Sequence, residues 1–175
     1  MTKKLSLPVS EDDHAQGNAR AAVTLVEYGD YQCPTCGVAY PIVKQLQKHF
    51  GDRLRFVHRN FPLTMHRYSE PAAETAEFAA SEGKFWEMHD ALYENQSEMS
   101  GDLFPELASE LGLSPQKLEE ALDGSNFTAL IEKDIASGEA SGVHGTPTFF
   151  LNGLRHDAPF DYETLKAAIT AATEK

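Results

Sequence analysis

The chain has 175 residues, of which 41% are hydrophobic and 24% charged, a composition typical of one packed domain and not of a disordered or fibrous chain. Fifteen Lys and Arg against 27 Asp and Glu give a formal net charge of −12, which disfavours nucleic acid as a partner because the phosphate backbone would be repelled. No apolar stretch approaches the roughly 18 to 20 residues of a membrane-spanning helix, so we expect no membrane insertion.

The N-terminus has the positive charges of a signal peptide, but no apolar core of about 7 to 15 residues follows them. As it stands, the sequence therefore predicts a cytoplasmic location. A periplasmic protein whose signal sequence had been removed would look the same, so that alternative stays open.

The first third of the chain has the pattern of a strand, a helix and a second strand. Alternation of Leu5, Leu7 and Val9 permits a short edge strand. The nearly continuous apolar run at residues 21–28 predicts a central strand that is covered on both faces. Apolar residues then recur at every fourth position from 38 to 50, which predicts a helix that contains Pro41. A strand over residues 54–61 would complete a parallel crossover.

From residue 65 to 143 the periodicity is helical throughout, with one helix start marked by Ser114 before a proline. Strands resume at 148–151 and 154–156, joined by a turn at Asn152-Gly153. Asp161 is the expected N-cap of a last helix. Because strands lie before and after the helical block but not inside it, we expect a helical insertion folded over one end of a sheet.

Both cysteines of the chain fall in one tetrapeptide, Cys33-Pro34-Thr35-Cys36, between the buried strand and the start of the helix. Unpaired N–H groups and the helix dipole at that position favour an anion, so Cys33 should ionise below the usual thiol value and act as a nucleophile. Cys36, inside the first helical turn, would resolve the mixed disulfide that Cys33 forms. Pro34 at the first helical position costs no hydrogen bond.

Three other functions could use these cysteines. A structural zinc site needs two more ligands, and the histidines include no pair spaced three to five residues apart. A Cu(I)-binding metallochaperone could hold its ion with the two thiolates alone, although the proline between them stiffens the loop. A glutathione-linked transferase or isomerase of the same broad fold could use one of the thiols, although such enzymes usually have a serine or a single thiol as the nucleophile. The last two stay open as alternatives to disulfide exchange.

The motif at 33–36, followed about 110 residues later by Gly145-Thr146-Pro147-Thr148 before a closing helix, resembles the DsbA-like branch of the thioredoxin superfamily. The resemblance implies an α/β thioredoxin-like fold with a central mixed sheet, made of residues 1–64 and 144–175, and an inserted helical subdomain at 65–143. It implies thiol–disulfide exchange with protein substrates, no cofactor, and a recycling partner such as glutathione, a thioredoxin system or a membrane oxidase.

The same resemblance assigns further roles. Glu27, six residues before the first cysteine, matches the family's buried acid, which exchanges a proton with the second cysteine. Pro41 matches the helix-kinking proline. Pro147 matches the family's cis-proline that faces the disulfide, and Thr146 before it would pair with an extended substrate peptide as an added strand.

Thr35 stands where strong oxidases often carry histidine, and it offers a hydroxyl in place of a positive charge. We therefore expect a Cys33 pKa between the values of DsbA, about 3.5, and thioredoxin, about 7. Two charged stretches remain. The basic residues at 53, 55, 58 and 59 are expected to form exposed pairs with surface carboxylates, and the acidic run 11–13 is expected to be a solvated loop.

Overall fold

A computed structural model describes residues 3–175 as a five-stranded mixed sheet with the strand order β1-β3-β2-β4-β5. β2 and β3 are parallel, and the other neighbouring pairs are antiparallel. The strands are β1 (His14–Gly17), β2 (Val23–Gly29), β3 (Leu54–Asn60), β4 (Thr148–Leu151) and β5 (Leu154–His156). The helices are α1 (Pro34–Phe50), α2 (Ser69–Ser81), α3 (Phe85–Glu94), α4 (Leu103–Glu110), α5 (Pro115–Asp123), α6 (Thr128–Ala140) and α7 (Tyr162–Thr173), with 3-10 turns at Gly51–Arg53 and Gln96–Glu98.

The central strand β2 is covered on both faces, as its apolar run predicts. Successive side chains of a strand point to opposite faces. Val23 and Leu25 pack with α1 and α7 in one cluster, whereas Val26 and Tyr28 pack with residues of the other face. A strand buried on both sides cannot alternate polar and apolar residues, and this explains the continuous run.

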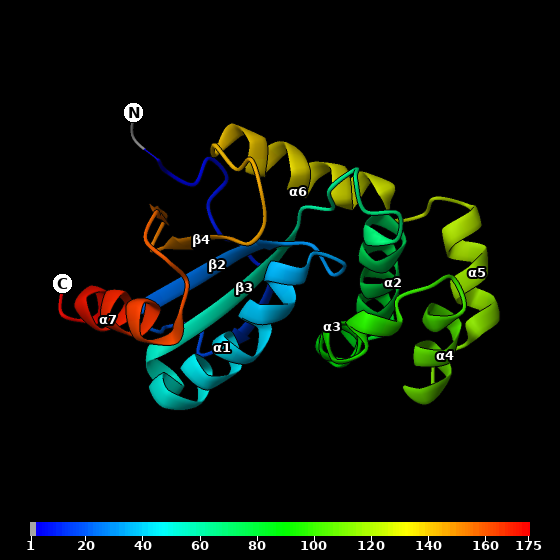
Figure 1. Cartoon of the computed structure of the whole chain (residues 1–175), viewed down its shortest axis with the longest axis horizontal. Coiled ribbons are helices and arrows are strands. Elements are labelled where there is room, and N and C mark those ends of the chain that lie inside the picture. The colour runs from blue at the N-terminus through cyan, green and yellow to red at the C-terminus, as the bar shows by residue number, and fades with distance from the viewer. Residues whose placement is uncertain (1–2) are drawn as a thin grey trace.

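The helices form layers around this sheet. In Figure 1, α1 and α7 lie on one side of the strands, α6 crosses the other side, and α2 to α5 gather at one end. Part of the predicted helical block thus caps the end of the sheet, while α6 covers a sheet face, where Ser137 meets Tyr28 at 2.7 Å between their hydroxyl oxygens. The thioredoxin-like fold expected from the sequence is confirmed. The subdomain boundaries at 64/65 and 143/144 stay a prediction.

The helix caps and the hairpin turn predicted from the sequence are present in the structure. The Ser114 side chain accepts a hydrogen bond from the backbone N–H of Lys117, and Asp161 accepts one from Thr164 at the start of α7. Asn152 and Gly153 both have positive φ, 47° and 84°, as a tight hairpin turn requires. Pro41 lies inside α1 on its exposed side.

The edge strand is displaced from its predicted position. It forms at His14–Gly17, where no alternation marks it, and not at residues 5–9. The N-terminal segment makes only an isolated bridge, between Lys4 and Leu154. Its next carbonyls, those of Leu7 and Pro8, accept hydrogen bonds from Arg59 and are therefore not free for a strand ladder.

Within residues 3–175, no helix combines the length and the apolar character that crossing a bilayer demands.

Candidate functional site

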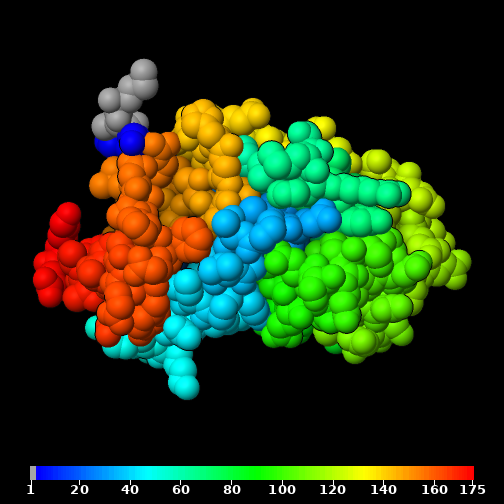
Figure 2. All heavy atoms as spheres, in the orientation of Figure 1, coloured from blue at the N-terminus to red at the C-terminus, as the bar shows by residue number. Residues whose placement is uncertain are grey.

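The two cysteines lie at the start of α1, where the sheet meets the helical block. Cys33 is the N-cap residue, with φ of −67° and ψ of 122°, and Pro34 follows at the first helical position. Cys33 is 6% exposed and Cys36 is 0% exposed, and both are free thiols. In the space-filling view, the light-blue surface where α1 begins lies between the green helices and the orange C-terminal part of the chain (Figure 2). Cys33 therefore keeps a small exposed fraction, whereas Cys36 has none.

The surroundings of Cys33 stabilise its thiolate. Hydrogen bonding with Cys36 is the largest cause, and the Thr35 hydroxyl adds to it. Together they outweigh partial burial and lower the Cys33 pKa from the usual value near 9 to about 4. The dipole of α1 acts in the same direction. This value lies at the acidic end of the interval expected from the sequence, so Cys33 is ionised at neutral pH.

Thr35 joins the motif to the loop that precedes β4. Its hydroxyl oxygen is 3.0 Å from the Cys33 sulfur and 2.9 Å from the carbonyl oxygen of Thr146, to which it donates. A hydroxyl has a single proton. When Cys33 loses its own proton, the Thr35 proton is best used by the thiolate, because hydrogen bonds to charged acceptors are the stronger ones.

Replacing Thr35 with valine should raise the Cys33 pKa. The variant keeps the side-chain shape but removes the donor, and a hydrogen bond to a charged group contributes about 1.5 to 3 kcal/mol, or roughly one to two pH units. The measurement is the pH dependence of Cys33 alkylation by iodoacetamide. T170V, on the exposed face of α7, should leave unchanged the pH at which alkylation is half-maximal. If alkylation of T35V is half-maximal at the same pH as in the unmodified protein, Thr35 does not donate to the Cys33 thiolate.

Cys36 is held as a thiol. Burial is the largest cause that raises its pKa above the usual value, and the hydrogen bond with Cys33 and the charge of Glu27 raise it further. The backbone N–H of Asp30 lies 3.5 Å from the Cys36 sulfur, which opposes these effects only weakly. Cys36 therefore needs a base before it can attack a disulfide.

Glu27 is the candidate base for Cys36, because its charge acts on that thiol. It is 2% exposed, which confirms the burial expected from the apolar run before it. Its Oε1 is 3.5 Å from the His58 Nδ1, and its Oε2 has no hydrogen-bond partner within residues 3–175. An unpartnered oxygen on a buried carboxylate is able to accept a proton, although the catalytic role of Glu27 stays a prediction here.

Thr146 contacts the cysteine motif although it lies 113 positions after Cys33 in the sequence. The Thr146–Pro147 peptide bond is cis. The Thr146 carbonyl accepts hydrogen bonds from the Thr35 hydroxyl and, at 3.5 Å, from the Cys33 thiol. Of the candidate site residues, Cys33, Pro34, Thr35 and Cys36 lie at the start of α1, Glu27 lies on β2, and Thr146 and Pro147 lie in the loop before β4.

Sequence reasoning missed Asp30, which anchors the loop before Cys33. Its buried carboxylate accepts hydrogen bonds from the backbone N–H groups of Gln32 at 2.8 Å and Leu63 at 3.0 Å, and from the Ser69 hydroxyl. It also contacts His66 Nδ1 at 2.9 Å. Its place next to the motif in sequence is the one signal that could have drawn attention to it.

Gln96 was also missed, and no sequence signal points to it. It lies in the helical block, and its side-chain amide donates to the carbonyls of Tyr31 and Cys33 at 2.8 and 2.9 Å. A Cβ at position 37 would lie within 3 Å of this amide, so Gly37 leaves the space that it occupies. The helical block thereby holds the main chain of the motif directly.

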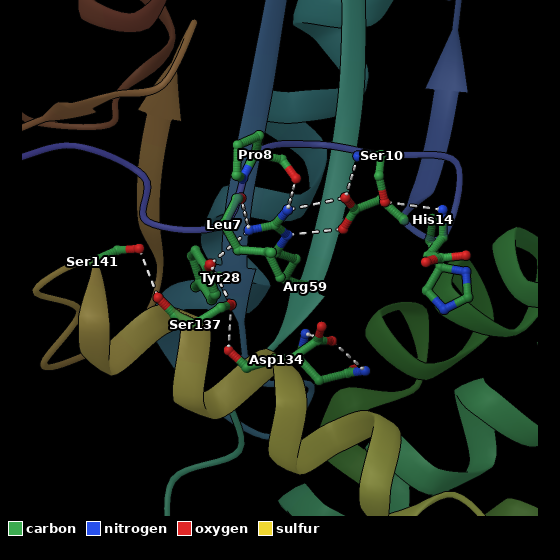
Figure 3. Close-up of polar contacts among 12 residues, drawn as sticks. Leu7, Pro8, Ser10, His14, Tyr28, Arg59, Asp134, Ser137 and Ser141 are labelled. Atoms are coloured by element: carbon green, nitrogen blue, oxygen red, sulfur yellow. Dashed lines mark hydrogen bonds and ion pairs between the residues drawn. The ribbon is translucent and has the colours of Figure 1, made fainter.

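The expectation for the charged stretches is wrong for His58, Arg59 and Asp13, and Arg53 donates to backbone carbonyls instead of pairing with a carboxylate. Arg59 and His58 are each 1% exposed, not on the surface. The Arg59 guanidinium forms two hydrogen bonds with Asp13, at 2.8 and 3.0 Å, so Asp13 is not part of a solvated loop. Figure 3 shows Arg59 between the N-terminal segment and Tyr28. A buried guanidinium is tolerated because every one of its donors forms a hydrogen bond. The periodicity of the sequence does not reveal such distant partners.

Within residues 3–175, no three or more His, Cys, Asp or Glu side chains are grouped so as to hold a metal ion.

Comparisons with known proteins agree with this geometry. A family model described as thioredoxin matches residues 9–171. The solved structure of oxidised BdbD from Bacillus subtilis is similar with a TM-score of 0.87 and 29% identity, covering 96% of both chains. A variant of α-DsbA1 from Wolbachia pipientis shares the fold, with a TM-score of 0.85 and 16% identity over 98% of this chain and 95% of that one.

A curated relative is longer. The Na(+)/H(+) antiporter NhaA 1 of Salinispora arenicola is 43% identical over 96% of this chain but only 26% of its own length, so the chain spans about a quarter of that relative. The family model, in contrast, covers most of the chain, and the protein belongs to the thioredoxin family, with DsbA-like and BdbD-like thiol–disulfide oxidoreductases as its structural neighbours.

Proposed function

We propose that this protein is a thiol–disulfide oxidoreductase that exchanges disulfides with protein substrates through Cys33 and Cys36. The observation that carries the proposal is the difference between the two sulfurs. The pKa of Cys33, which is slightly exposed, is lowered to about 4, whereas the pKa of fully buried Cys36 is raised above its usual value. A ready nucleophile next to a protected thiol is what two-step disulfide exchange needs.

In the reducing direction, the Cys33 thiolate attacks a substrate disulfide and forms a mixed disulfide, and one substrate sulfur leaves as a thiolate. Glu27 then accepts the Cys36 proton, and the Cys36 thiolate attacks the Cys33 sulfur. The second substrate thiolate leaves, so that the substrate has gained two electrons and the protein has lost them to a Cys33–Cys36 disulfide. The oxidising direction is the reverse, with Glu27 returning the proton to Cys36.

The Thr146 carbonyl is suited to hold the substrate during these steps. While Cys33 is a thiol, this carbonyl accepts hydrogen bonds from both Thr35 and Cys33. Once Cys33 is a thiolate and Thr35 donates to it, the carbonyl is free to accept a backbone N–H from an extended substrate peptide. Thr146 and Pro147 would then form the docking edge for an added strand.

The low Cys33 pKa favours the oxidising direction. A stabilised thiolate stabilises the reduced protein, which makes its disulfide a better oxidant. We expect the reduction potential to lie closer to the value of DsbA, about −120 mV, than to that of thioredoxin, about −270 mV. Protein thiols would be the main substrates, and glutathione, a thioredoxin system or a membrane oxidase would recycle the protein.

The test is equilibration of the protein in glutathione buffers of graded composition, with the two thiols counted by alkylation and mass spectrometry. A reversible Cys33–Cys36 disulfide and catalysed oxidation of a reduced, unfolded protein substrate are expected. If no internal disulfide forms at any composition, the proposed function is wrong. If it forms with a potential near that of thioredoxin, only the proposed direction is wrong.

Neither the Cu(I)-binding nor the glutathione-linked alternative is supported by the family match or by the structural neighbours. The activity is proposed for this chain alone. The chain matches only about a quarter of the length of the antiporter relative.

A further inference from the structure

Three titratable side chains lie in one row across the sheet, and the mechanism above uses only one of them. His14 on β1 is the register partner of His58 on β3, and His58 is the register partner of Glu27 on β2. Register partners on neighbouring strands project to the same face, about 5 Å apart. The row therefore runs from the sheet edge to the acid beside Cys36.

The inner part of the row is buried and unpartnered. The His58 side chain is 0% exposed, and within residues 3–175 neither of its ring nitrogens has a hydrogen-bond partner. The nearest approach is its Nδ1 to the Glu27 Oε1, at 3.5 Å. A Cβ at Gly29 would lie 2.9 Å from both this oxygen and the His58 ring, so the glycine provides the space in which they meet. Buried polar groups rarely lack partners, and these need an explanation.

The outer part of the row reaches a cavity at the sheet edge that is lined by both charged and apolar side chains. This cavity of about 90 Å³ is lined by residues that include His58, His14 and Glu77. It has room for several water molecules, because one water needs about 10–15 Å³ and polar partners. At its margin, the His14 Nε2 lies 2.7 Å from the Glu77 carboxylate, and the His14 side chain is 24% exposed. Figure 3 shows His14 on this side of the molecule, next to a carboxylate.

We propose that His58 carries the Cys36 proton between Glu27 and the cavity at the β1 edge, so that the proton exchanges with solvent away from the substrate. When Cys36 attacks the mixed disulfide, its proton passes to Glu27, then to a nitrogen of His58, whose other nitrogen releases a proton toward the cavity. No electron moves along this path. In the oxidising direction the proton returns by the same route. The inference rests on the proposed function.

The direction of exit follows from the order of the strands. β4, which follows Thr146 and Pro147, lies on one side of β2, and β3 and β1 lie on the other. A substrate docked at the Thr146–Pro147 loop would therefore leave the β1 edge open. Proton transfer could continue while the substrate covers Cys33.

Other titratable or charged groups face His58 from the elements packed around it. They are Glu27, His14, Glu77, His89, Lys133 and Asp134, with Asp12 and Asp13 across the cavity and Tyr31 from the loop before α1. Two of them are held neutral by burial, which lowers the pKa of His89 and raises that of Tyr31. They are also bonded to each other, at 2.9 Å. His58 is thus the buried histidine of this cluster whose nitrogens are free to move a proton.

The experiment follows the two steps of oxidation by glutathione disulfide, with acid quenching and mass spectrometry to separate the mixed disulfide from the internal one. His58→Phe should slow the second step at least tenfold at neutral pH, because general acid–base transfer contributes about 100-fold or more. The pH dependence and the solvent deuterium isotope effect of the second step should also change in this variant. The first step and the alkylation profile of Cys33 should stay as they are.

His58→Gln keeps a polar side chain beside Glu27 but transfers no proton, so it should slow the second step in the same way. It replaces His58→Phe if that variant does not fold. The matched control is His89→Phe, because His89 is equally buried but lies off the row. It should keep the pH profile of the unmodified protein. A His58→Gln protein with an unchanged second step and pH profile would overturn the proton path. If the unmodified protein never forms the internal disulfide, the proposed function itself has failed.

Discussion

Replacing Cys33 with serine is expected to abolish disulfide exchange, lowering its rate by more than about 1,000-fold, or about 4 kcal/mol in activation free energy. The reason is that Cys33 is the sulfur ionised at neutral pH, with a pKa of about 4. A serine hydroxyl is not ionised there and forms no disulfide. The remaining thiol, Cys36, is 0% exposed and protonated, so it cannot take over the reaction.

Replacing Cys36 with serine should have a different effect. Cys33 would still attack a substrate disulfide, but nothing would resolve the product, so a stable mixed disulfide should accumulate in a one-to-one ratio. Non-reducing electrophoresis and mass spectrometry distinguish the two variants directly. Accumulation of a mixed disulfide by C33S, or rapid alkylation of Cys36 in the folded protein, would reverse the assigned roles.

The second large effect is expected from Arg59→Met, which should lower the free energy of unfolding by about 3 to 5 kcal/mol, the usual cost of breaking a buried ion pair. Arg59 uses its five donors on Asp13, Tyr28 and the carbonyls of Leu7 and Pro8. The variant leaves the Asp13 carboxylate without its counter-ion and releases the N-terminal segment. Urea denaturation gives the free energy, and hydrogen exchange at residues 7–13 locates the loss.

Exposed Arg53 offers a matched control. It donates to the carbonyls of Phe50 and His49 at a helix end, and Arg53→Met should change the free energy of unfolding by no more than about 0.5 kcal/mol. Equal losses in the two variants would show that the buried contacts of Arg59 contribute nothing specific.

The pH dependence of unfolding should confirm the ion pair. Burial alone would raise the Asp13 pKa, but the Arg59 hydrogen bond and charge outweigh it and lower that pKa below the usual value. A lowered folded-state pKa adds stability above the unfolded-state value, near 4, and this stability is lost as the pH falls through the folded-state pKa. In Arg59→Met, burial still raises the Asp13 pKa and the Ser10 N–H still lowers it, but the Arg59 hydrogen bond and charge are lost, so this contribution should shrink. A variant with the same acid dependence as the unmodified protein would rule out the assigned coupling.

The sequence by itself determined the features that depend on neighbours along the chain. The helix start at Pro34, the caps at Ser114 and Asp161, and the turn at Asn152-Gly153 follow from backbone sterics and local hydrogen bonds. The twofold burial of β2 follows from its unbroken apolar run. The meeting of Thr146 with Cys33 did not come from these signals. It was expected only through the resemblance to a known family.

Only the tertiary structure decided which polar side chains are buried and what they bond. Arg59, Asp30 and Gln96 look like ordinary surface residues in the sequence, yet each joins segments that lie 31 to 65 residues apart. The same holds for His58, whose neighbours come from other strands and helices. A charged or polar residue is stable in the interior only when distant partners satisfy it, and such partners carry no local periodicity. The pattern of the chain therefore revealed the pair of cysteines, and long-range packing supplied the groups that hold them and the route proposed for their proton.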